Sequence, residues 1–203
     1  MKLLKFARIA MRTRFEIAIA DEGDEATLRA AGEEAFDEIE RVEAQLSIFR
    51  PDSGLSKVNS AAGGEPLRVD PRLFNFLKRA LQFSMMTDGA FDMTVGPLVH
   101  LWSNATASIP SEERIAEAKS LVGMRENLEI DETCGTVRLA RPGTRLDPGA
   151  IGKGYALERA SELMRETGIK NALLHGGTST VVAIGTPPGE PFWRVALQHP
   201  LVK

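Results

Sequence analysis

The sequence contains little cysteine, little net charge and no long apolar run, and each absence narrows the possible functions. Cys134 is the only cysteine among 203 residues, so neither an intramolecular disulfide nor a thiolate metal cluster can form. The formal net charge of -3 gives no basic surplus of the kind that nucleic-acid-binding proteins carry. We therefore expect no nucleic-acid partner.

The apolar stretches of the chain are short. None reaches the roughly 18 residues that a membrane-spanning helix needs. Residues 1–7 are basic and mildly apolar, but they lack the apolar core of roughly 7–15 residues that a secretory signal contains. We therefore expect no membrane span and a cytoplasmic location, unless a leader has been removed from the sequence.

Familiar catalytic motifs are also missing. The chain has no Gly-x-Ser-x-Gly nucleophile elbow, and His100, His175 and His199 show no zinc-ligand spacing. His175 ends an apolar run before two glycines, where functional side chains often lie. A lone histidine there is more often a structural hydrogen-bond donor, so the histidines indicate no zinc enzyme.

Hydrophobic periodicity predicts both helices and strands in a chain of ordinary composition, 43% apolar and 26% charged. Spacings of three and four residues predict helices over 25–47, 70–84, 111–122 and 152–167, with one further helical turn at 55–59. Alternation between turn signals predicts strands over 15–20, 66–69, 127–130, 136–140, 171–175, 181–184 and 192–197. The apolar stretch 95–102 is interrupted, and we expect it to be buried and irregular. This mixed order indicates an α+β fold.

The most informative stretch runs from Arg145 to Tyr155, where a loop enters a predicted helix. It combines an acidic residue, Asp147, with three glycines and Lys153. Glycines let the backbone approach a ligand closely, and a helix N-terminus suits phosphate. The spacing differs from a Walker A motif, which has four residues between its glycine and Gly-Lys. The local pattern fits a phosphate site and a structural turn equally well, with Asp147 as a cap or turn residue in the second case.

A second stretch places two carboxylates, Asp88 and Asp92, close to a glycine and to Phe91. Such a group could bind an amine-bearing ring or a metal. Asp-Gly is also a common turn, and Phe91 could anchor the core. The residues alone favour the turn.

Four segments, in the same order along the chain, resemble motifs of the FAD:protein FMN transferase (ApbE) family, formerly called thiamine biosynthesis lipoproteins. They are Met11-Arg12-Thr13; Leu46-Ser47-Ile48-Phe49-Arg50-Pro51-Asp52-Ser53 with Ser56 and Asn59; Thr87-Asp88-Gly89-Ala90-Phe91-Asp92-Met93-Thr94-Val95-Gly96-Pro97-Leu98; and Leu146-Asp147-Pro148-Gly149-Ala150-Ile151-Gly152-Lys153-Gly154-Tyr155. Gly176-Gly177 and Trp193-Arg194-Val195 also fit the family pattern. The third and fourth segments are long enough to be specific.

The resemblance implies a single ApbE-like, T-fold-related α+β domain over residues 1–203. It also implies a magnesium-dependent transfer of FMN from FAD to a threonine hydroxyl of an acceptor flavoprotein, with release of AMP. Seven positions match residues that contact FAD in the family: Met11, Phe49, Ala90, Phe91, Asp92, Asp147 and Lys153. Ala150 matches a backbone ligand of magnesium. No catalytic residue is assigned, and family members are often exported lipoproteins.

The sequence departs from the family pattern in several places. Arg12 replaces a glycine, Met93 replaces a proline, Pro148 and Ala150 vary the fourth motif, and Phe49 lacks the hydroxyl that a tyrosine has. The family's C-terminal magnesium motif does not occur, so we expect a truncated family member. Two alternatives to transfer therefore stay open: a magnesium-dependent FAD pyrophosphatase that yields FMN and AMP, and a flavin-binding module without turnover.

Overall fold

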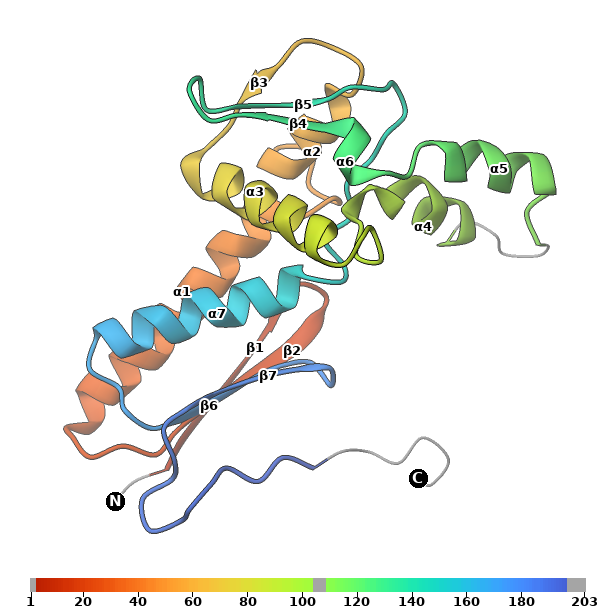
Figure 1. Ribbon diagram of the computed structural model, residues 1–203. Coiled ribbons are helices and arrows are strands. Elements are labelled where there is room, and N and C mark those ends of the chain that lie inside the picture. The colour runs from red at the N-terminus through yellow and green to blue at the C-terminus, as the bar shows by residue number, and fades with distance from the viewer. Residues whose placement is uncertain (1–2, 104–108, 197–203) are drawn as a thin grey trace. The chain divides into compact units, whose positions relative to one another are not determined.

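Segments from both ends of the chain build one sheet, while the middle of the chain forms a second compact unit. The computed structural model describes residues 3–103 and 109–196. Unit 1 combines the chain up to Glu43 with the chain from Ile151 onward, and unit 2 runs from Ala44 to Ala150. Figure 1 labels their helices and strands. The single domain that the resemblance implies stays a prediction.

Unit 1 contains a four-stranded antiparallel sheet in the order β1-β2-β6-β7. Its strands are β1 (Leu4–Ala10), β2 (Thr13–Ile19), β6 (Ala172–Gly176) and β7 (Thr180–Ile184). Alternate residues of β2, namely Phe15, Ile17 and Ile19, are at most 1% exposed, and Ile17 is paired with the buried Leu174. One face of the sheet therefore forms half of an apolar core.

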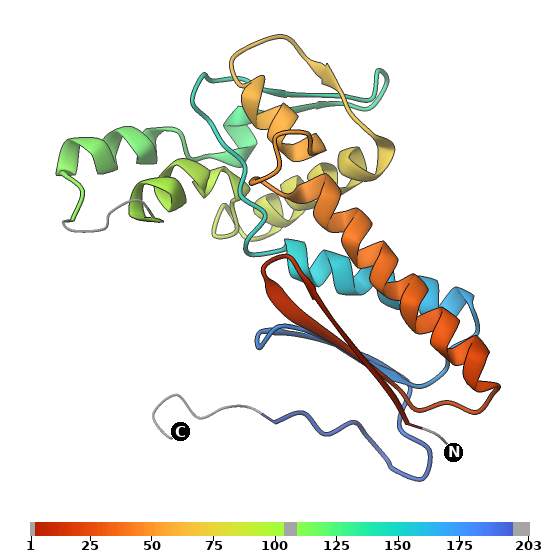
Figure 2. The same cartoon turned by 180° about the vertical axis from the view of Figure 1, so that it is seen from behind.

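Two helices, α1 (Glu25–Leu46) and α7 (Gly152–Glu166), cover that face of the sheet, as Figures 1 and 2 show from opposite sides. Gly32 lets α1 approach the sheet, since a Cβ there would lie 2.9 Å from the Phe6 ring. A Cβ at Gly176 would lie 3.1 Å from the Phe15 ring of the neighbouring strand β2 and 3.4 Å from the Leu157 side chain of α7. The Asp24 carboxylate caps α1 by accepting the Thr27 N–H at 3.1 Å.

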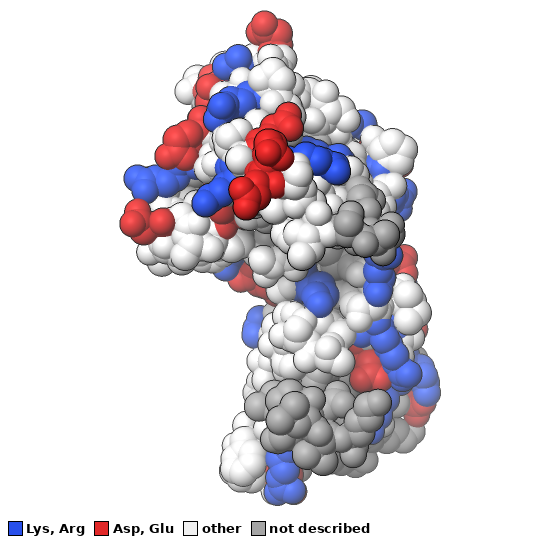
Figure 3. All heavy atoms as spheres, turned by 90° about the vertical axis from the view of Figure 1, so that its right-hand side faces the viewer, with Lys and Arg blue, Asp and Glu red and all other residues white. Residues whose placement is uncertain are grey.

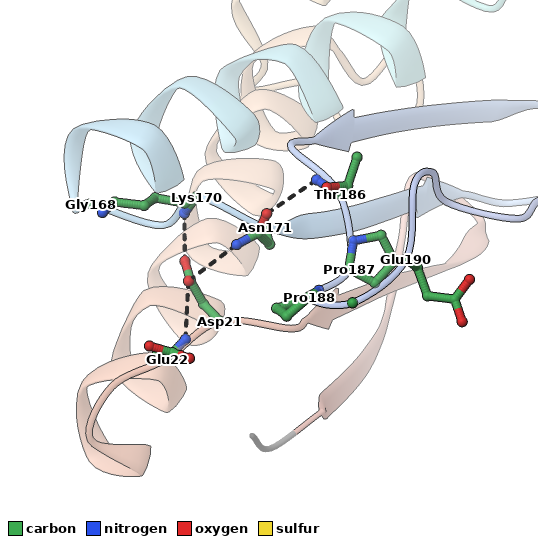
Figure 4. A pocket seen from close by; sticks show the side chains of 10 residues that line it. Asp21, Glu22, Gly168, Lys170, Asn171, Thr186, Pro187, Pro188 and Glu190 are labelled. Atoms are coloured by element: carbon green, nitrogen blue, oxygen red, sulfur yellow. Dashed lines mark hydrogen bonds between the residues drawn. The ribbon is translucent and has the colours of Figure 1, made fainter.

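A buried carboxylate, Asp21, fastens the end of the sheet at which β2 stops and β6 begins. It is 8% exposed and accepts hydrogen bonds from the Lys170 N–H, the Glu22 N–H and the Asn171 amide. Figure 4 shows these bonds beside a pocket of about 480 Å³. Burial alone would raise the pKa of Asp21, but the hydrogen bonds outweigh burial and hold the pKa below its usual range.

Unit 2 packs helices around a small antiparallel sheet in the order β3-β5-β4. Its strands are β3 (Leu67–Arg68), β4 (Leu128–Asp131) and β5 (Thr136–Leu139). Its helical elements are α2 (Gly54–Ser60), α3 (Pro71–Met86), the 3₁₀ helix η1 (Met93–Val95), α4 (Gly96–Ser103), α5 (Glu112–Ser120) and α6 (Met124–Asn127). Leu55, Leu73, Met93 and Met124 are all at most 1% exposed, so the unit has its own core.

Charged side chains of both signs are interspersed on the face of the molecule in Figure 3. Ion pairs in unit 2 include Lys78 with Glu132 at 2.7 Å and Arg138 with Glu129 at 3.2 Å. Surface pairs of this kind contribute little stability. They do mean that these basic side chains already have carboxylate partners.

The α+β class and most predicted elements are confirmed, with two errors. The stretch 95–102 is helical, not irregular: Val95 ends η1 and the rest lies in α4, where Pro97 sits in the first turn, which needs no N–H donor at that point. It is also only partly buried, since Val99 and Trp102 are exposed. Residues 192–196 form no strand, and Leu197 lies outside the described residues. Trp193 instead donates its indole N–H to the Ile184 carbonyl at 3.2 Å, so this segment meets the end of β7 through a side chain and not through a backbone ladder.

The first strand, β1, was not predicted, because Arg8 interrupts its apolar alternation on the helix-facing side. Its guanidinium lies 5.1 Å from the centre of the Phe36 ring and pairs with Asp37 at 3.0 Å and Glu40 at 2.8 Å. These acidic residues of α1 neutralise the charge of Arg8, which the alternation of the strand places on the face that packs against the helices. Within the described ranges, no helix combines the length and the apolar character that a membrane crossing requires. The cytoplasmic location stays a prediction.

Asp21→Asn is expected to lower the free energy of unfolding by about 1–3 kcal/mol at pH 7, because an amide cannot accept all the hydrogen bonds of the carboxylate. The folded-state pKa of Asp21 lies below its unfolded value of about 3.9. Its stabilisation is therefore fully present above the unfolded pKa and is lost as the pH falls through the folded pKa. Urea unfolding followed by circular dichroism at pH 7 and at about pH 3 measures the difference, with the exposed Glu22→Gln as the control. An equal loss at both pH values would exclude the ionised carboxylate as the source.

Candidate functional site

The predicted site residues fall into two groups, one in each unit. Unit 2 contains Phe49, Ala90, Phe91, Asp92, Asp147 and Ala150, and unit 1 contains Met11 and Lys153. Within each unit the structure brings together segments that are far apart in the sequence.

In unit 2, the backbone around Leu146 is held by a side-chain amide. Asn59 accepts the Leu146 N–H on Oδ1 at 2.8 Å and donates from Nδ2 to the Leu146 carbonyl at 3.0 Å. Leu146 is 1% exposed, so these backbone groups would otherwise lack partners in a region that excludes water. The next residue, Asp147, donates its N–H to the Met93 carbonyl at 2.7 Å. The second, third and fourth motifs thus meet on one short segment.

Gly96 allows this segment to pass. A Cβ at Gly96 would lie 2.4 Å from the Arg145 carbonyl oxygen, closer than real Cβ atoms approach. Any larger residue would push the two segments apart. The glycine of the third motif is therefore explained by the passage of the fourth motif over it.

Asp147 forms the turn that follows the held segment. Its Oδ1 accepts the Gly149 N–H at 2.7 Å, as in an Asx turn. Its Oδ2 receives no hydrogen bond from any residue that the structure describes, and the side chain is half-buried. The turn interpretation is confirmed, and one carboxylate oxygen is still open to a ligand. Among the described residues, no group of three His, Cys, Asp or Glu side chains could hold a metal ion.

Asp92, in contrast, has both carboxylate oxygens engaged. Oδ1 accepts hydrogen bonds from the N–H and the hydroxyl of Thr94, and Oδ2 accepts the Met124 N–H at 2.7 Å. The Thr94 hydroxyl in turn accepts the Gly123 N–H at 2.8 Å. Asp92 therefore caps η1 and joins it to α6, a structural role that the residue types alone favoured. Its contact with FAD stays a prediction.

The turn between α3 and Asp92 exposes Asp88, Gly89 and Ala90. Asp88 and Gly89 have φ values of 49° and 81°, and a Cβ at Gly89 would meet nothing within 4 Å. Ala90 is exposed. Phe91 is half-buried and not a core anchor: its ring meets the Phe83 ring edge-on, with 6.2 Å between centroids. Its backbone N–H donates to the Thr87 hydroxyl at 3.0 Å.

Phe49 is presented by a turn that serine side chains build. The Ser53 hydroxyl donates to the Ser47 carbonyl at 2.6 Å and accepts the Ser56 N–H at 2.9 Å. The Phe49 side chain that follows this framework is 68% exposed. The serines of the second motif therefore stabilise this turn, and the aromatic ring of Phe49 is exposed to solvent.

In unit 1, the β1–β2 connection is a two-residue turn with an unfavourable backbone. Met11 and Arg12 have φ values of 47° and 61°, in the left-handed region that this type of hairpin requires. Asn, Asp and Gly are the usual residues there, and a side chain like that of Met or Arg costs about 1–2 kcal/mol. Backbone strain of this kind often accompanies functional sites. The strain is therefore consistent with the predicted contact between Met11 and FAD.

The β6–β7 loop lies against this turn. Gly177 has a φ of 69° and donates its N–H to the Arg14 carbonyl at 3.0 Å. A Cβ at Gly177 would lie 2.7 Å from the Thr13 hydroxyl oxygen. Both the backbone angle and the available space therefore require glycine, which explains the Gly-Gly of the sequence at its second position.

Lys153 reaches the same loop from the first turn of α7. Its Nζ donates to the Ser179 hydroxyl at 2.9 Å. The N-cap residue of α7, Ile151, gives no side-chain hydrogen bond, so the helix begins without a side-chain cap on its N–H groups. Ser179 was not predicted, because a serine in a polar loop gives no sequence signal. The strained turn, the β6–β7 loop and Lys153 thus occupy one end of the sheet.

Asn59→Ala is expected to lower the free energy of unfolding by about 2–4 kcal/mol, because two buried backbone groups of Leu146 lose their partners. Urea unfolding at neutral pH measures this change, and Asn75→Ala, at an exposed position of α3, is the matched control. A loss no larger than that of the control would show that the Asn59 amide does not hold the segment.

Arg12→Gly is expected to raise the free energy of unfolding by about 0.5–1 kcal/mol, since relief of the left-handed strain exceeds the extra flexibility of glycine in the unfolded chain. Thermal unfolding compares this variant with Arg14→Gly, which removes a neighbouring exposed arginine from an extended strand position. The control should be destabilised. A destabilised Arg12→Gly would contradict the strain argument.

Comparison with known proteins identifies relatives that match most of the chain. The model of the ApbE family matches residues 11–203. The chain is 32% identical over 208 residues to the FAD:protein FMN transferase of Treponema pallidum (strain Nichols), covering 96% of this chain and 57% of that protein. It is 33% identical over 173 residues to a protein of the same name from Klebsiella pneumoniae (strain 342), covering 84% and 52%. The chain thus spans about half the length of these curated relatives.

Solved structures of proteins with the same family name have a similar fold. The flavin transferase ApbE from Vibrio cholerae superposes with a TM-score of 0.85 at 27% identity, covering 98% of this chain and 64% of that chain. The ApbE protein from Thermotoga maritima gives a TM-score of 0.83 at 28% identity, covering 93% and 61%. Because the family match runs over residues 11–203 and solved family members share this fold, the chain belongs to the ApbE family.

Proposed function

We propose that the chain acts in an FAD:protein FMN transferase, which moves FMN from FAD to a threonine hydroxyl of an acceptor flavoprotein and releases AMP. The names of the relatives support this reaction. The observation that carries the proposal is the turn at Asp147, which Asn59, Met93 and Gly96 hold in place while one carboxylate oxygen is left open.

The reaction breaks the phosphoanhydride bond of FAD. The threonine oxygen forms a bond to the FMN phosphorus, the threonine proton is released, and AMP departs with the bridging oxygen. Negative charge grows on the phosphate oxygens, so a protein that accelerates the step has to stabilise that charge. Lys153 and the N-terminus of α7 supply positive charge and N–H donors of the required kind.

Magnesium is the cation that the family resemblance implies, and the residues present fit it in part. Magnesium takes oxygen ligands and usually binds one or two carboxylates together with substrate phosphates. The open Oδ2 of Asp147 and the backbone carbonyl of Ala150 are such oxygens. When bound, the ion would offset the charge of the pyrophosphate.

The apolar members of the predicted set suit the ring systems of FAD. Phe49 offers a largely exposed ring, and Phe91 a half-buried one whose position is fixed by Phe83. Exposed aromatic rings can stack on planar ligands. We therefore assign these residues, with Met11 and Ala90, to contacts with the rings of FAD and not to its phosphates.

Asp147→Asn and Lys153→Ala are each expected to weaken FAD binding in the presence of Mg²⁺ by about tenfold or more, which corresponds to about 1.4 kcal/mol. Titration of flavin fluorescence measures the affinity. Asp131→Asn is the control for Asp147, since Asp131 also accepts backbone N–H groups in an exposed turn. Lys5→Ala, an exposed lysine of β1, is the control for Lys153. Unchanged affinity in both site variants would remove this stretch from the site.

The products decide between transfer and its alternatives. The chain is incubated with FAD, Mg²⁺ and a peptide that contains the acceptor threonine, and the mixture is analysed by mass spectrometry. FMN attached to the peptide supports the proposal. Free FMN and AMP without a modified peptide would indicate a pyrophosphatase, and FAD binding without products would indicate a flavin-binding module.

A further inference from the structure

We propose that Ser179 is a positioning residue for Lys153, which it holds in the orientation that meets the pyrophosphate of FAD. The inference rests on the proposed function, because it assumes that Lys153 contacts phosphate oxygens. Its structural basis is the hydrogen bond of 2.9 Å from Lys153 Nζ to the Ser179 hydroxyl. The two residues lie 26 positions apart in the sequence, on α7 and on the β6–β7 loop.

Ser179 is suited to this task because its loop is fixed. Gly177 anchors the loop to β2 through its hydrogen bond to the Arg14 carbonyl, and the space beside it admits no Cβ. The loop is closed at its base by the pairing of Gly176 with Thr180. A lysine side chain is long and flexible, and much of its rotamer freedom is lost when it binds a ligand. Contact with a fixed hydroxyl removes part of that freedom before the ligand arrives.

The chemistry of the partner also matters. A lysine ammonium has three N–H donors, and the hydroxyl occupies only one of them. The hydroxyl is neutral, so the positive charge of Lys153 is not offset. Lys78 and Arg8, in contrast, pair with carboxylates, and Lys153 makes no ion pair with any residue that the structure describes. Ser179 thus orients the cation and preserves its charge for an anionic ligand.

The test measures FAD affinity in the full chain by flavin fluorescence with Mg²⁺ present. Ser179→Ala is expected to weaken binding by about three- to tenfold, the range for one modest hydrogen bond. Ser179→Thr keeps a hydroxyl and should retain most of the affinity. Thr178→Ala is the matched control, because it removes a hydroxyl from the same exposed loop that makes no hydrogen bond within the described residues. Thermal unfolding without ligand should be the same for all three variants.

A double-mutant cycle identifies the route of the effect. If Ser179 acts through Lys153, then Ser179→Ala adds nothing in a Lys153→Ala background. An equal loss in both backgrounds, or no loss in the single variant, overturns the inference while the proposed function stands if Lys153→Ala itself weakens binding. Unchanged affinity in Lys153→Ala and Asp147→Asn, or no FAD binding by the unmodified chain, overturns the proposed function and this inference with it.

Discussion

The pair of hydrogen bonds between the Asn59 amide and the Leu146 backbone is the interaction on which the geometry of unit 2 depends. A chain segment that crosses a core outside any sheet must satisfy its N–H and C=O groups from side chains. The Asn59 side chain pairs with both backbone groups of Leu146, and the Met93 carbonyl accepts the N–H of Asp147. Gly96 leaves room for the backbone of this segment to pass. The turn that follows therefore has a defined position although it contains no regular structure.

These contacts also explain why three motifs that are far apart in the sequence occur together in one protein. Asn59 has no evident role within its own helix, and Gly96 has none within α4. Each is required by the segment around Leu146, which lies 87 residues beyond Asn59. Changing any one of them would displace Asp147 without touching its side chain. Residues that hold a site and residues that form it thus both belong to the motifs, so a motif match alone does not separate them.

The sequence permitted prediction of local structure better than of these long-range roles. Helices α1, α3 and α7 follow from apolar spacing, and in the structure the Asp24 and Asp70 carboxylates cap α1 and α3. Strand β1 was missed because Arg8 occupies an inward position that only the acids of α1 make acceptable. The strand predicted at 192–196 does not form. A strand needs the backbone of another segment to pair with, and no described segment pairs with these residues. The motif segments were predicted, but the capping role of Asp92 and the contact of Ser179 depend on neighbours that no local pattern reveals.

The two groups of site residues differ in electrostatic character. Unit 2 offers a carboxylate oxygen of Asp147 that no described residue occupies, which suits a cation. Unit 1 offers an ammonium with a neutral partner and a helix N-terminus without a side-chain cap, which suit an anion. Other charged side chains, such as the buried Glu38 with Arg41 at 2.7 Å, are matched within the protein. The Asp147 oxygen and the Lys153 ammonium, each within its own unit, therefore have charge that a ligand of opposite sign can neutralise.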